Sequence, residues 1–516
     1  MLRYTNTVVV TASTPLIRRF VHLENGPYLT HTKHETQEKV KAFDEIPTRN
    51  ANILQAVFDM IYLKRKGLLT RSDLVVQENA DKYGPIMRNF IGNQFIVQIV
   101  DPILVEKVFR AEGKYPQRMD FKPWKEYRAA RKLPLGLFLQ DGEAWHKSRQ
   151  AIGKRILKPI AMAPYLPAMK NITDEMIGRL RRIQIKEGEK KDIMPDLEEE
   201  LFKWSMEGVT MVLLDHRLGL LSDKIDKQSQ SFIDATHEIF ATTLELFLFN
   251  DFHKRFNTKL WQRHVAAWDT SISLTKNLIQ HRVEDFMSAK EKGSEVKEDT
   301  FLGALIANSD LTQEEIFGNL SELIGAAIDT TSYTFLWTLY LLAHNPDAQA
   351  KLHKEICDAL PVGKQITQED LAKLVYMKMV IKEALRMNPV VTGLSRKLEN
   401  DIVLNGYHIP AKTTIAVQFY PMLKNPNYFE DPLDFRPERW DRTKKNSKDV
   451  NAFASIPFGF GTRMCIGRRF AEQEMHLLLA EIIRQFDVVP TKTVGITTKL
   501  VVIPDEPVDL KFIDRH

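Results

Sequence analysis

Apolar residues recur at helical spacing along most of the chain, and the longest such run extends from Ile316 to Leu342. Thr312 and Glu315 precede the run at the spacing of a capping box, and the sequence His-Asn-Pro at 344–346 follows it. At 1.5 Å per residue this pattern predicts one helix roughly 45 Å long, enough to cross a whole domain.

Strand patterns are few and short. Residues 95–100 (FIVQIV) predict a strand, and Asp101 and Pro102 supply an N-cap and a first-turn proline for a helix directly after it. Residues 401–409 hold Asn-Gly between two apolar runs, which is a strong hairpin signal. The whole pattern predicts a mainly α fold with a small β region, organised as one large domain, because the polar stretches at 288–299 and 441–449 look like solvated loops.

The first 23 residues differ from the rest of the chain. They contain three arginines and several Ser and Thr, and no acidic residue occurs before Glu24. No early apolar run approaches the 20 residues of a membrane-spanning helix. We therefore expect a mitochondrial transit peptide over about residues 1–35 and a folded domain over 36–516, the alternative being a disordered basic tail.

Composition excludes several classes of protein. The 516 residues are 44% hydrophobic and 27% charged, which suits a large globular core. Two cysteines are too few for a disulfide framework, and no paired spacing suggests zinc. The 72 basic and 67 acidic residues nearly balance, which argues against a protein that binds nucleic acid by neutralising phosphates.

One of the two cysteines lies in the stretch FGFGTRMCIG, residues 458–467. Helical periodicity follows Cys465, so its sulfur lies near a helix N-terminus, where free backbone N–H groups favour a thiolate. Gly459 and Gly461 permit a tight turn, and Arg463 suits a carboxylate. A thiolate, amide donors and an arginine together suit a haem with propionates. A nucleophile is less favoured because His476 is about three helical turns away, and a buried structural cysteine is the alternative.

The middle of the long predicted helix reads GAAIDTT, residues 325–331. Its small residues allow a bulky group to approach the backbone, whereas Asp329 and Thr330 are unusual inside a buried helix because unpaired polar groups are costly there. The alternative is a helix–helix contact in which the threonine hydroxyl bonds back to a carbonyl.

These motifs resemble the cytochrome P-450 family of haem-thiolate monooxygenases. The haem-binding pattern F-x-x-G-x-R-x-C-x-G of that family is met by Phe458, Gly461, Arg463, Cys465 and Gly467. Weaker motifs of the family extend the resemblance over most of the chain after about residue 50, namely Glu383-x-x-Arg386, FRPERW at 435–440 and Trp145-x-x-x-Arg149.

The resemblance implies the cytochrome P-450 fold, with a long distal helix and with haem b held between helices by Cys465. It further implies haem contacts from Trp145, Arg149, Arg396, Phe458, Arg463 and Gly467, a proton relay from Asp329 and Thr330, and a structural network of Glu383, Arg386 and Arg439. Ala327 departs from the pattern, which more often has Gly there, and the added methyl group narrows the distal pocket.

The branch of the family is suggested by the amino-terminal segment and by four basic residues. The mitochondrial branch takes electrons from a small acidic iron–sulfur ferredoxin, which an NADPH-dependent reductase reduces. Positions similar to Lys378, Lys382, Arg468 and Arg469 dock that ferredoxin in the family, and a solvated basic face is the alternative. We therefore expect a protein on the matrix side of mitochondria, with peripheral contact to the inner membrane as an option.

The sequence indicates the substrate less clearly than the cofactor. By family analogy residues 115–140 and 240–256 cover the pocket. The segment Leu246–Phe252 precedes Lys254 and Arg255, which suits either an amphipathic element on a membrane or a helix end in the core. A sterol, a secosteroid, a fatty acid or a xenobiotic remains open. The alternatives to a monooxygenase are a haem-thiolate isomerase or dehydratase without dioxygen, and a haem-based sensor.

Overall fold

The computed structural model describes residues 39–92, 94–157, 159–187, 193–223, 227–292, 300–308, 310–360, 366–443 and 451–515. The expected transit peptide lies outside these residues, as do parts of the two polar stretches predicted to be loops. None of the helices in the described ranges is long and apolar enough to cross a membrane.

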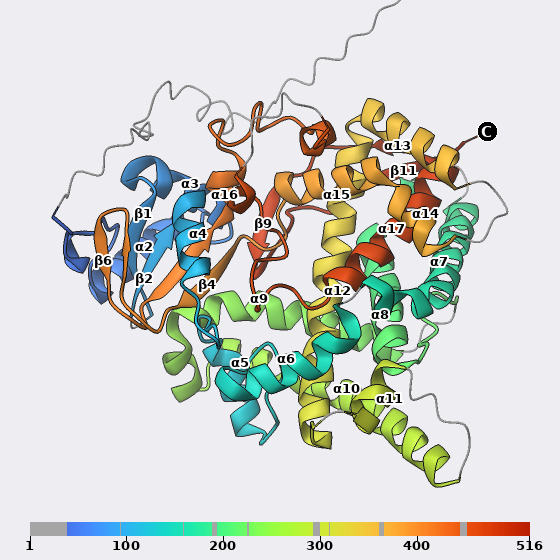
Figure 1. Cartoon of the computed structure of the whole chain (residues 1–516), viewed down its shortest axis with the longest axis horizontal. Helices are drawn as coiled ribbons and strands as arrows, with labels where there is room; N and C mark the ends of the chain where they lie inside the picture. The colour runs from blue at the N-terminus through green and yellow to red at the C-terminus, as the bar shows by residue number, and fades with distance from the viewer. Residues whose placement is uncertain are drawn as a thin grey trace, which may run out of the picture.

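Helices form most of the molecule, and the long helix α12 (Gln313–Ala343) runs through its middle (Figure 1). The other helices of this body are α5 (Lys122–Ala130), α6 (Gly142–Ile156), α7 (Leu166–Glu187), α8 (Leu197–Leu214), α9 (Lys227–Arg255), α10 (Lys259–Glu291), α11 (Phe301–Asn308), α13 (Pro346–Ala359), α14 (Gln368–Lys373), α15 (Val375–Met387) and α17 (Arg468–Gln485).

A four-stranded sheet lies to one side of the helical body (Figure 1). Its order is β1 (Ile86–Ile91), β2 (Gln94–Ile99), β7 (Thr414–Gln418) and β4 (Gly393–Lys397). Only the β2–β7 pair of this sheet is parallel, and it joins segments far apart in sequence. The remaining helices are α2 (Ile53–Arg65), α3 (Ser72–Tyr83), α4 (Pro102–Arg110) and α16 (Phe419–Leu423), with short 3₁₀ turns η1 (Phe43–Glu45), η2 (Pro159–Tyr165), η4 (Pro437–Trp440) and η5 (Ala452–Ala454).

Three smaller sheets complete the β structure of the described residues. They pair β5 (Ile402–Leu404) with β6 (Tyr407–Ile409), β9 (Ile496–Lys499) with β10 (Val501–Pro504), and β11 (Leu510–Asp514) with both β3 (Ile193–Met194) and β8 (Phe486–Pro490). All these pairs are antiparallel. The mainly α fold with a small β region is thus confirmed.

The local signals of the sequence produce the predicted elements. At the start of α12 the Thr312 hydroxyl accepts from the N–H of Glu315, whose carboxylate accepts from the N–H of Thr312 at 2.8 Å. Asp101 caps α4 by accepting from two backbone N–H groups. In the β5–β6 hairpin Asn405 and Gly406 adopt φ of 50° and 79°, the left-handed turn that this pair favours.

The main core surrounds the second half of α12. Phe335 and Trp337 are almost fully buried there, and the Phe335 ring packs on Trp204 of α8 with centroids 5.1 Å apart. Each such side chain contributes about 1.5–3 kcal/mol by leaving water. The middle of the same helix differs, since Ala326 is exposed although it lies well inside the helical body. The packing around α12 is therefore interrupted at this point.

Candidate active site

The loop that precedes α17 carries Cys465. Gly459 and Gly461 both have φ of +74°, a region that favours glycine, and the predicted tight turn is therefore confirmed. The backbone N–H of Cys465 donates to the carbonyl of Phe458 at 2.8 Å, which closes the loop on itself. The sulfur consequently lies three residues before the first helical residue, Arg468.

The Cys465 thiol is enclosed by protein yet reachable from open space. Burial raises its pKa, while the N–H of Gly467 and the guanidinium of Arg149 act in the opposite direction. At the same time the residue has accessible surface. Because the thiol is enclosed by protein and the residue still has accessible surface, Cys465 faces an internal space. Its sulfur is therefore available as a ligand for a group bound in that space.

The middle of α12 offers a second accessible surface inside the protein. A Cβ built on Gly325 meets nothing within 4 Å, and Ala326 beside it is exposed. Thr330, one turn later, is partly exposed, and its hydroxyl donates to the carbonyl of Ala326 at 2.8 Å. The helical back-bond considered from the sequence is thus present, and it leaves the hydroxyl oxygen on the open side of the helix.

Asp329 points away from that open side. The residue is 1% exposed, and its Oδ1 has no hydrogen-bond partner among the described residues. Burial raises the pKa of its carboxyl group to about 8, with a further contribution from the negative charge of Glu198. The group is therefore largely protonated near neutral pH and can act as a proton donor.

Four arginines gather near the Cys465 loop. Arg463 donates to the Pro116 carbonyl and to Asp141, both at 2.7 Å, and its guanidinium lies 4.2 Å from the centre of the Trp145 ring. Arg396 pairs with Glu112. Arg149 makes no hydrogen bond or ion pair with any described residue. The structure thus brings together Trp145, Arg149, Arg396 and Arg463, all chosen from the sequence.

The fourth arginine, Arg118, was missed. The residue is partly exposed, but its Nε is buried without a partner among the described residues, and its guanidinium lies 4.9 Å from the centre of the Phe138 ring. Burial and the neighbouring Arg396 lower its pKa to about 10, and burial lowers that of Arg463 to about 9. Glu112 pairs with Arg396 and Asp141 with Arg463, whereas Arg118 and Arg149 make no ion pair with a described residue. This leaves positive charge suited to further carboxylates.

Glu383 is the centre of a buried network that was expected from the sequence. It is fully buried and accepts from Arg386 and from Arg439, each at 2.8 Å. Trp440 Nε1 and the N–H of Arg436 complete its shell at 2.9 and 3.0 Å. Arg386 also donates to three carbonyls of the segment 423–434, so the network fixes that irregular stretch against α15.

The four basic residues predicted to dock a partner differ in their surroundings. Lys378 is exposed, and its ammonium donates to the Ala372 carbonyl. Lys382 lies 3.8 Å from the Trp440 ring centre, and burial lowers its pKa to about 8. Arg468 and Arg469, about 40% exposed, both pair with Glu472. That glutamate offsets the unfavourable placement of two cations at a helix N-terminus.

A buried carboxylate that was missed from the sequence fixes the loop before α6. Glu322 of α12 accepts from the N–H groups of Gly136, Phe138 and Leu139 at 2.7, 2.8 and 3.2 Å. The buried guanidinium of Arg128 lies 3.7 Å away. No sequence motif pointed to this residue.

Aromatic side chains line the segments expected to cover the pocket. Phe121 of the 115–140 segment contacts Phe138 and Phe247, with centroids 4.8 and 5.0 Å apart. Phe252 and Phe256 are instead 53% and 63% exposed. The helix is interrupted between the two groups, at Phe249. The segment therefore packs into the core at its start and presents apolar surface at its end.

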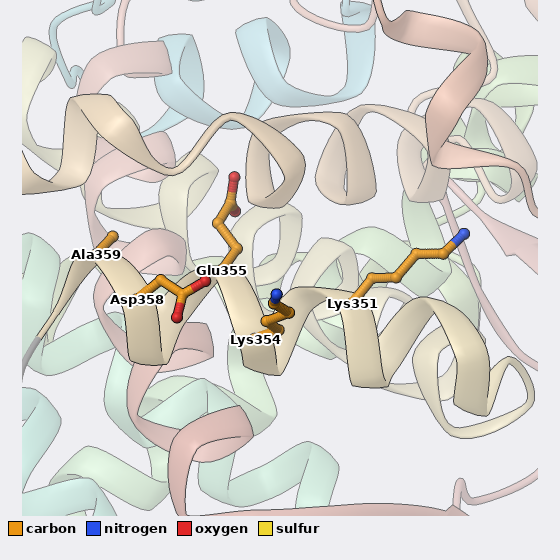
Figure 2. Close-up of a pocket in the computed structure, with 5 residues that line it drawn as sticks. All are labelled: Lys351, Lys354, Glu355, Asp358 and Ala359. Atoms are coloured by element: carbon orange, nitrogen blue, oxygen red, sulfur yellow. The ribbon is translucent and has the colours of Figure 1, made fainter.

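A surface hollow of about 480 Å³ lies along α13 (Figure 2) and is lined by Lys351, Lys354, Glu355, Asp358 and Ala359. Glu355 accepts from the first backbone N–H groups of α15, and Lys351 pairs with Glu438. These contacts give the lining a structural role, and the hollow contains none of the residues considered above.

Comparison with known proteins gives a consistent picture. The cytochrome P450 family profile matches residues 60–512. The chain is 34% identical to the mitochondrial sterol 26-hydroxylase of Oryctolagus cuniculus, over 84% of this chain and 82% of that enzyme. It is also 34% identical to the mitochondrial 1,25-dihydroxyvitamin D(3) 24-hydroxylase of Rattus norvegicus, over 83% and 80% of the two chains.

A third relative is the mitochondrial cholesterol side-chain cleavage enzyme of Sus scrofa, again 34% identical, over 84% of this chain and 83% of that enzyme. Among solved structures, the cytochrome P450DA heme domain superposes with a TM-score of 0.73. It covers 93% of this chain and 99% of that chain at 20% identity, a likeness that concerns the fold.

Proposed function

The chain belongs to the cytochrome P450 family, and on this basis we propose that it is a mitochondrial, ferredoxin-dependent monooxygenase that hydroxylates a sterol or secosteroid. The family establishes a haem-thiolate monooxygenase. The observation that carries the proposal is the pairing of an accessible, enclosed Cys465 with an open stretch of α12 that bears Thr330 beside the protonated Asp329.

The residues of the site fit a haem. Cys465 would hold the haem iron through its sulfur, which the N–H of Gly467 supports. Arg149 and the unpartnered Nη1 of Arg463 are free to bind propionates, while the Arg396–Glu112 contact keeps a third guanidinium near them. Trp145 and Phe458 are assigned as the remaining contacts of the cofactor. When bound, the haem activates dioxygen, and its thiolate ligand donates electron density that favours O–O cleavage.

The distal residues hold and move protons. Asp329 is kept neutral by burial, so it has a proton to give near neutral pH. The Thr330 hydroxyl lies on the open side of the helix and can pass that proton into the space on that side, where the haem would bind. Proton transfer by a positioned side chain contributes about 10²–10⁴-fold to a rate, which makes these two residues the proposed catalytic pair.

The proposed electron donor is a small acidic ferredoxin, reduced by an NADPH-dependent reductase. Lys378, Lys382, Arg468 and Arg469 would dock it. Their positive charges influence one another, since Arg468 contributes to the lowered pKa of Lys382. Such a cluster attracts an acidic partner and raises its rate of association.

The lipid substrate is supported by two features. The relatives with 34% identity are named for sterol and vitamin D chemistry. The aromatic cluster of Phe121, Phe138 and Phe247 supplies an apolar wall, while exposed Phe252 and Phe256, next to Lys254 and Arg255, suit peripheral contact with the inner membrane.

The test is turnover by the purified holoenzyme with NADPH, ferredoxin reductase and ferredoxin against a panel of sterols, secosteroids, fatty acids and xenobiotics. We expect oxygenated product from a sterol or secosteroid, and little product when a microsomal diflavin reductase replaces ferredoxin. Product without dioxygen would instead indicate an isomerase or dehydratase. Saturable ligand binding without any product would indicate a sensor.

A further inference from the structure

Three ionisable groups, Glu198, Tyr333 and Asp329, follow one another in space from the surface toward the middle of α12. Tyr333, one turn after Asp329 on the same helix, donates its hydroxyl hydrogen to Oε1 of Glu198 at 2.6 Å. Tyr333 is 3% exposed and Asp329 1% exposed, whereas Glu198 on α8 is only partly buried. The contact therefore joins a buried helix position to a residue that is partly exposed.

From this arrangement we propose that Glu198 and Tyr333 form the route by which protons from solvent reach Asp329. The inference rests on the proposed function, because it requires a reaction that consumes protons at Asp329 and Thr330. Neither Glu198 nor Tyr333 touches the reacting atoms, and both act through Asp329.

Spacing along α12 supports the inner step of the route, which is the transfer from Tyr333 to Asp329. Residues four apart on a helix are neighbours on one face, so Tyr333 and Asp329 share a face of α12. The Tyr333 hydroxyl donates to Glu198 and not to Asp329, so the proposed transfer to Asp329 passes through a water molecule. Tyr333 also feels the charge of Asp329, which contributes to the raised pKa of Tyr333. Asp329 has an oxygen without a partner among the described residues, which leaves it able to receive a proton.

The outer step of the route is the uptake of a proton from solvent by Glu198, and it depends on the surroundings of that carboxylate. Burial raises the pKa of its carboxyl group, and the Tyr333 hydroxyl and the Lys499 ammonium of β9 lower it. His237 and Asp234 of α9 and Glu199 of α8 are further ionisable groups on this side. Burial lowers the pKa of His237, and Glu199 pairs with Lys203 at 2.6 Å. Glu198 is thus the carboxylate that exchanges protons between solvent and Tyr333.

The packing of α12 on α8 holds the route in place. Ser332, beside Tyr333, donates to the Leu201 carbonyl of α8 at 3.0 Å, and the Phe202 ring lies 5.2 Å from the ring of Tyr333. These contacts fix the tyrosine against α8 and leave its hydroxyl at Glu198. The geometry therefore comes from the core of the protein and not from a surface loop.

The transfer balances without any redox change. After Asp329 gives up a proton toward Thr330, the Glu198 carboxylate takes a proton from solvent. The Tyr333 hydroxyl then gives its proton to the Asp329 carboxylate and takes the new proton from Glu198. Glu198 is left ionised, as at the start, and the Tyr333 hydroxyl rotates back to donate to it. One proton moves inward for each cycle of the route.

The first experiment measures turnover by the holoenzyme variants Tyr333→Phe and Glu198→Gln with reductase, ferredoxin and the substrate that the parent enzyme accepts. We expect product formation to fall by about 10- to 100-fold, within the range of general acid–base effects, and more NADPH to be diverted to peroxide. The solvent deuterium isotope effect should rise, and Glu198→Asp should restore part of the rate. Tyr340→Phe is the matched control, because its hydroxyl lies on the same helix and contacts Val494 and no carboxylate.

A second experiment needs no turnover. The carbonyl stretch of the protonated Asp329 carboxyl group, assigned by its loss in Asp329→Asn, is followed against pH by difference infrared spectroscopy. Glu198→Gln removes a negative charge that raises the Asp329 pKa, so the apparent pKa should fall. Tyr340→Phe should leave it unchanged.

The outcomes separate the two proposals. If the parent enzyme forms no product from any lipid, the proposed function fails, and the infrared titration still tests the link from Glu198 to Asp329. If both variants keep the parent rate, coupling and isotope effect, the route is wrong. An unchanged Asp329 pKa in Glu198→Gln would overturn it as well.

Discussion

Glu322 of α12 accepts a hydrogen bond from the backbone N–H of Gly136 at 2.7 Å, and this contact fixes the loop before α6 against the central helix. The loop approaches α12 very closely, because a Cβ on Gly136 would overlap the carbonyl oxygen of Gly318 and lie 2.7 Å from the Glu322 carboxylate. A Cβ on Gly318 would in turn lie 2.9 Å from the Leu135 carbonyl oxygen. Both glycines are needed for steric reasons.

The first prediction follows from that close approach. Gly136→Ala should destabilise the protein by about 1–3 kcal/mol or more, as overpacked positions do, and should displace the loop that carries Phe138. Gly325→Ala is the control, since its Cβ would meet nothing within 4 Å and alanine favours a helix. Chemical denaturation of the two variants measures the difference. Equal stability would show that the loop does not pack as described.

A second prediction concerns the two cysteines. Cys465→Ala should abolish the red-shifted Soret band of the reduced carbon monoxide complex, because that band requires a thiolate ligand. Cys357→Ala should retain the band, since Cys357 is on the outer face of α13, where its thiol lies 3.4 Å from His353. Absorption spectra of the reduced, carbon monoxide-treated variants decide the matter. A spectrum that survives the loss of Cys465 would reject the ligand assignment.

The third prediction concerns pH. The Asp329 carboxyl group has a pKa near 8 in the folded protein and an ordinary pKa of about 3.9 when unfolded. Between these values the native state holds a proton that the unfolded state has released, so this group lowers stability as pH rises from about 4 to about 8. At pH 7 the loss reaches up to about 4 kcal/mol.

Asp329→Asn removes this dependence. The free energy of unfolding of the variant minus that of the parent should therefore increase as pH rises from about 4 to about 8. Above about pH 8 this gap should become constant. Denaturation at pH 5, 7 and 8.5 measures the gap, with the exposed Asp310→Asn as control. A gap independent of pH would mean that Asp329 titrates normally.

Local sequence signals carried much of the fold. The capping box of Thr312 and Glu315, the Asp101 cap and the Asn405–Gly406 turn each act within a few residues, so the sequence alone locates the elements they begin or join. The Cys465 loop belongs with them, because its glycines and arginine form one short motif.

The parts of the site that were missed depend on partners far apart in sequence. Glu322 meets Gly136 across 186 positions, and Tyr333 meets Glu198 across 135. A glutamate or tyrosine on a helix has no periodic pattern that reveals such a partner. Arg118 was missed for a related reason, since the charged groups that act on it, such as Arg396 and Glu322, are far from it in sequence.

The final prediction separates the two lysines proposed to dock ferredoxin. Lys378 is exposed, so Lys378→Glu should weaken the ferredoxin complex without affecting the fold. Lys382 lies over the Trp440 ring and near the buried Glu383, so a carboxylate there would also destabilise the network of Glu383. Lys382→Gln is therefore the suitable variant at that position.

We expect Lys378→Glu to lower the affinity for ferredoxin about tenfold and Lys382→Gln to have a smaller effect, because like charges replace attractive pairs only in the first. Salt should weaken the parent complex steeply, since the Debye length falls from about 10 Å at 0.1 M to about 3 Å at 1 M. The rate of electron transfer at several salt concentrations measures both effects. Lys259→Glu, an exposed position on α10, is the control and should retain the parent rate. If Lys378→Glu and Lys259→Glu behave alike, ferredoxin docks elsewhere on the protein.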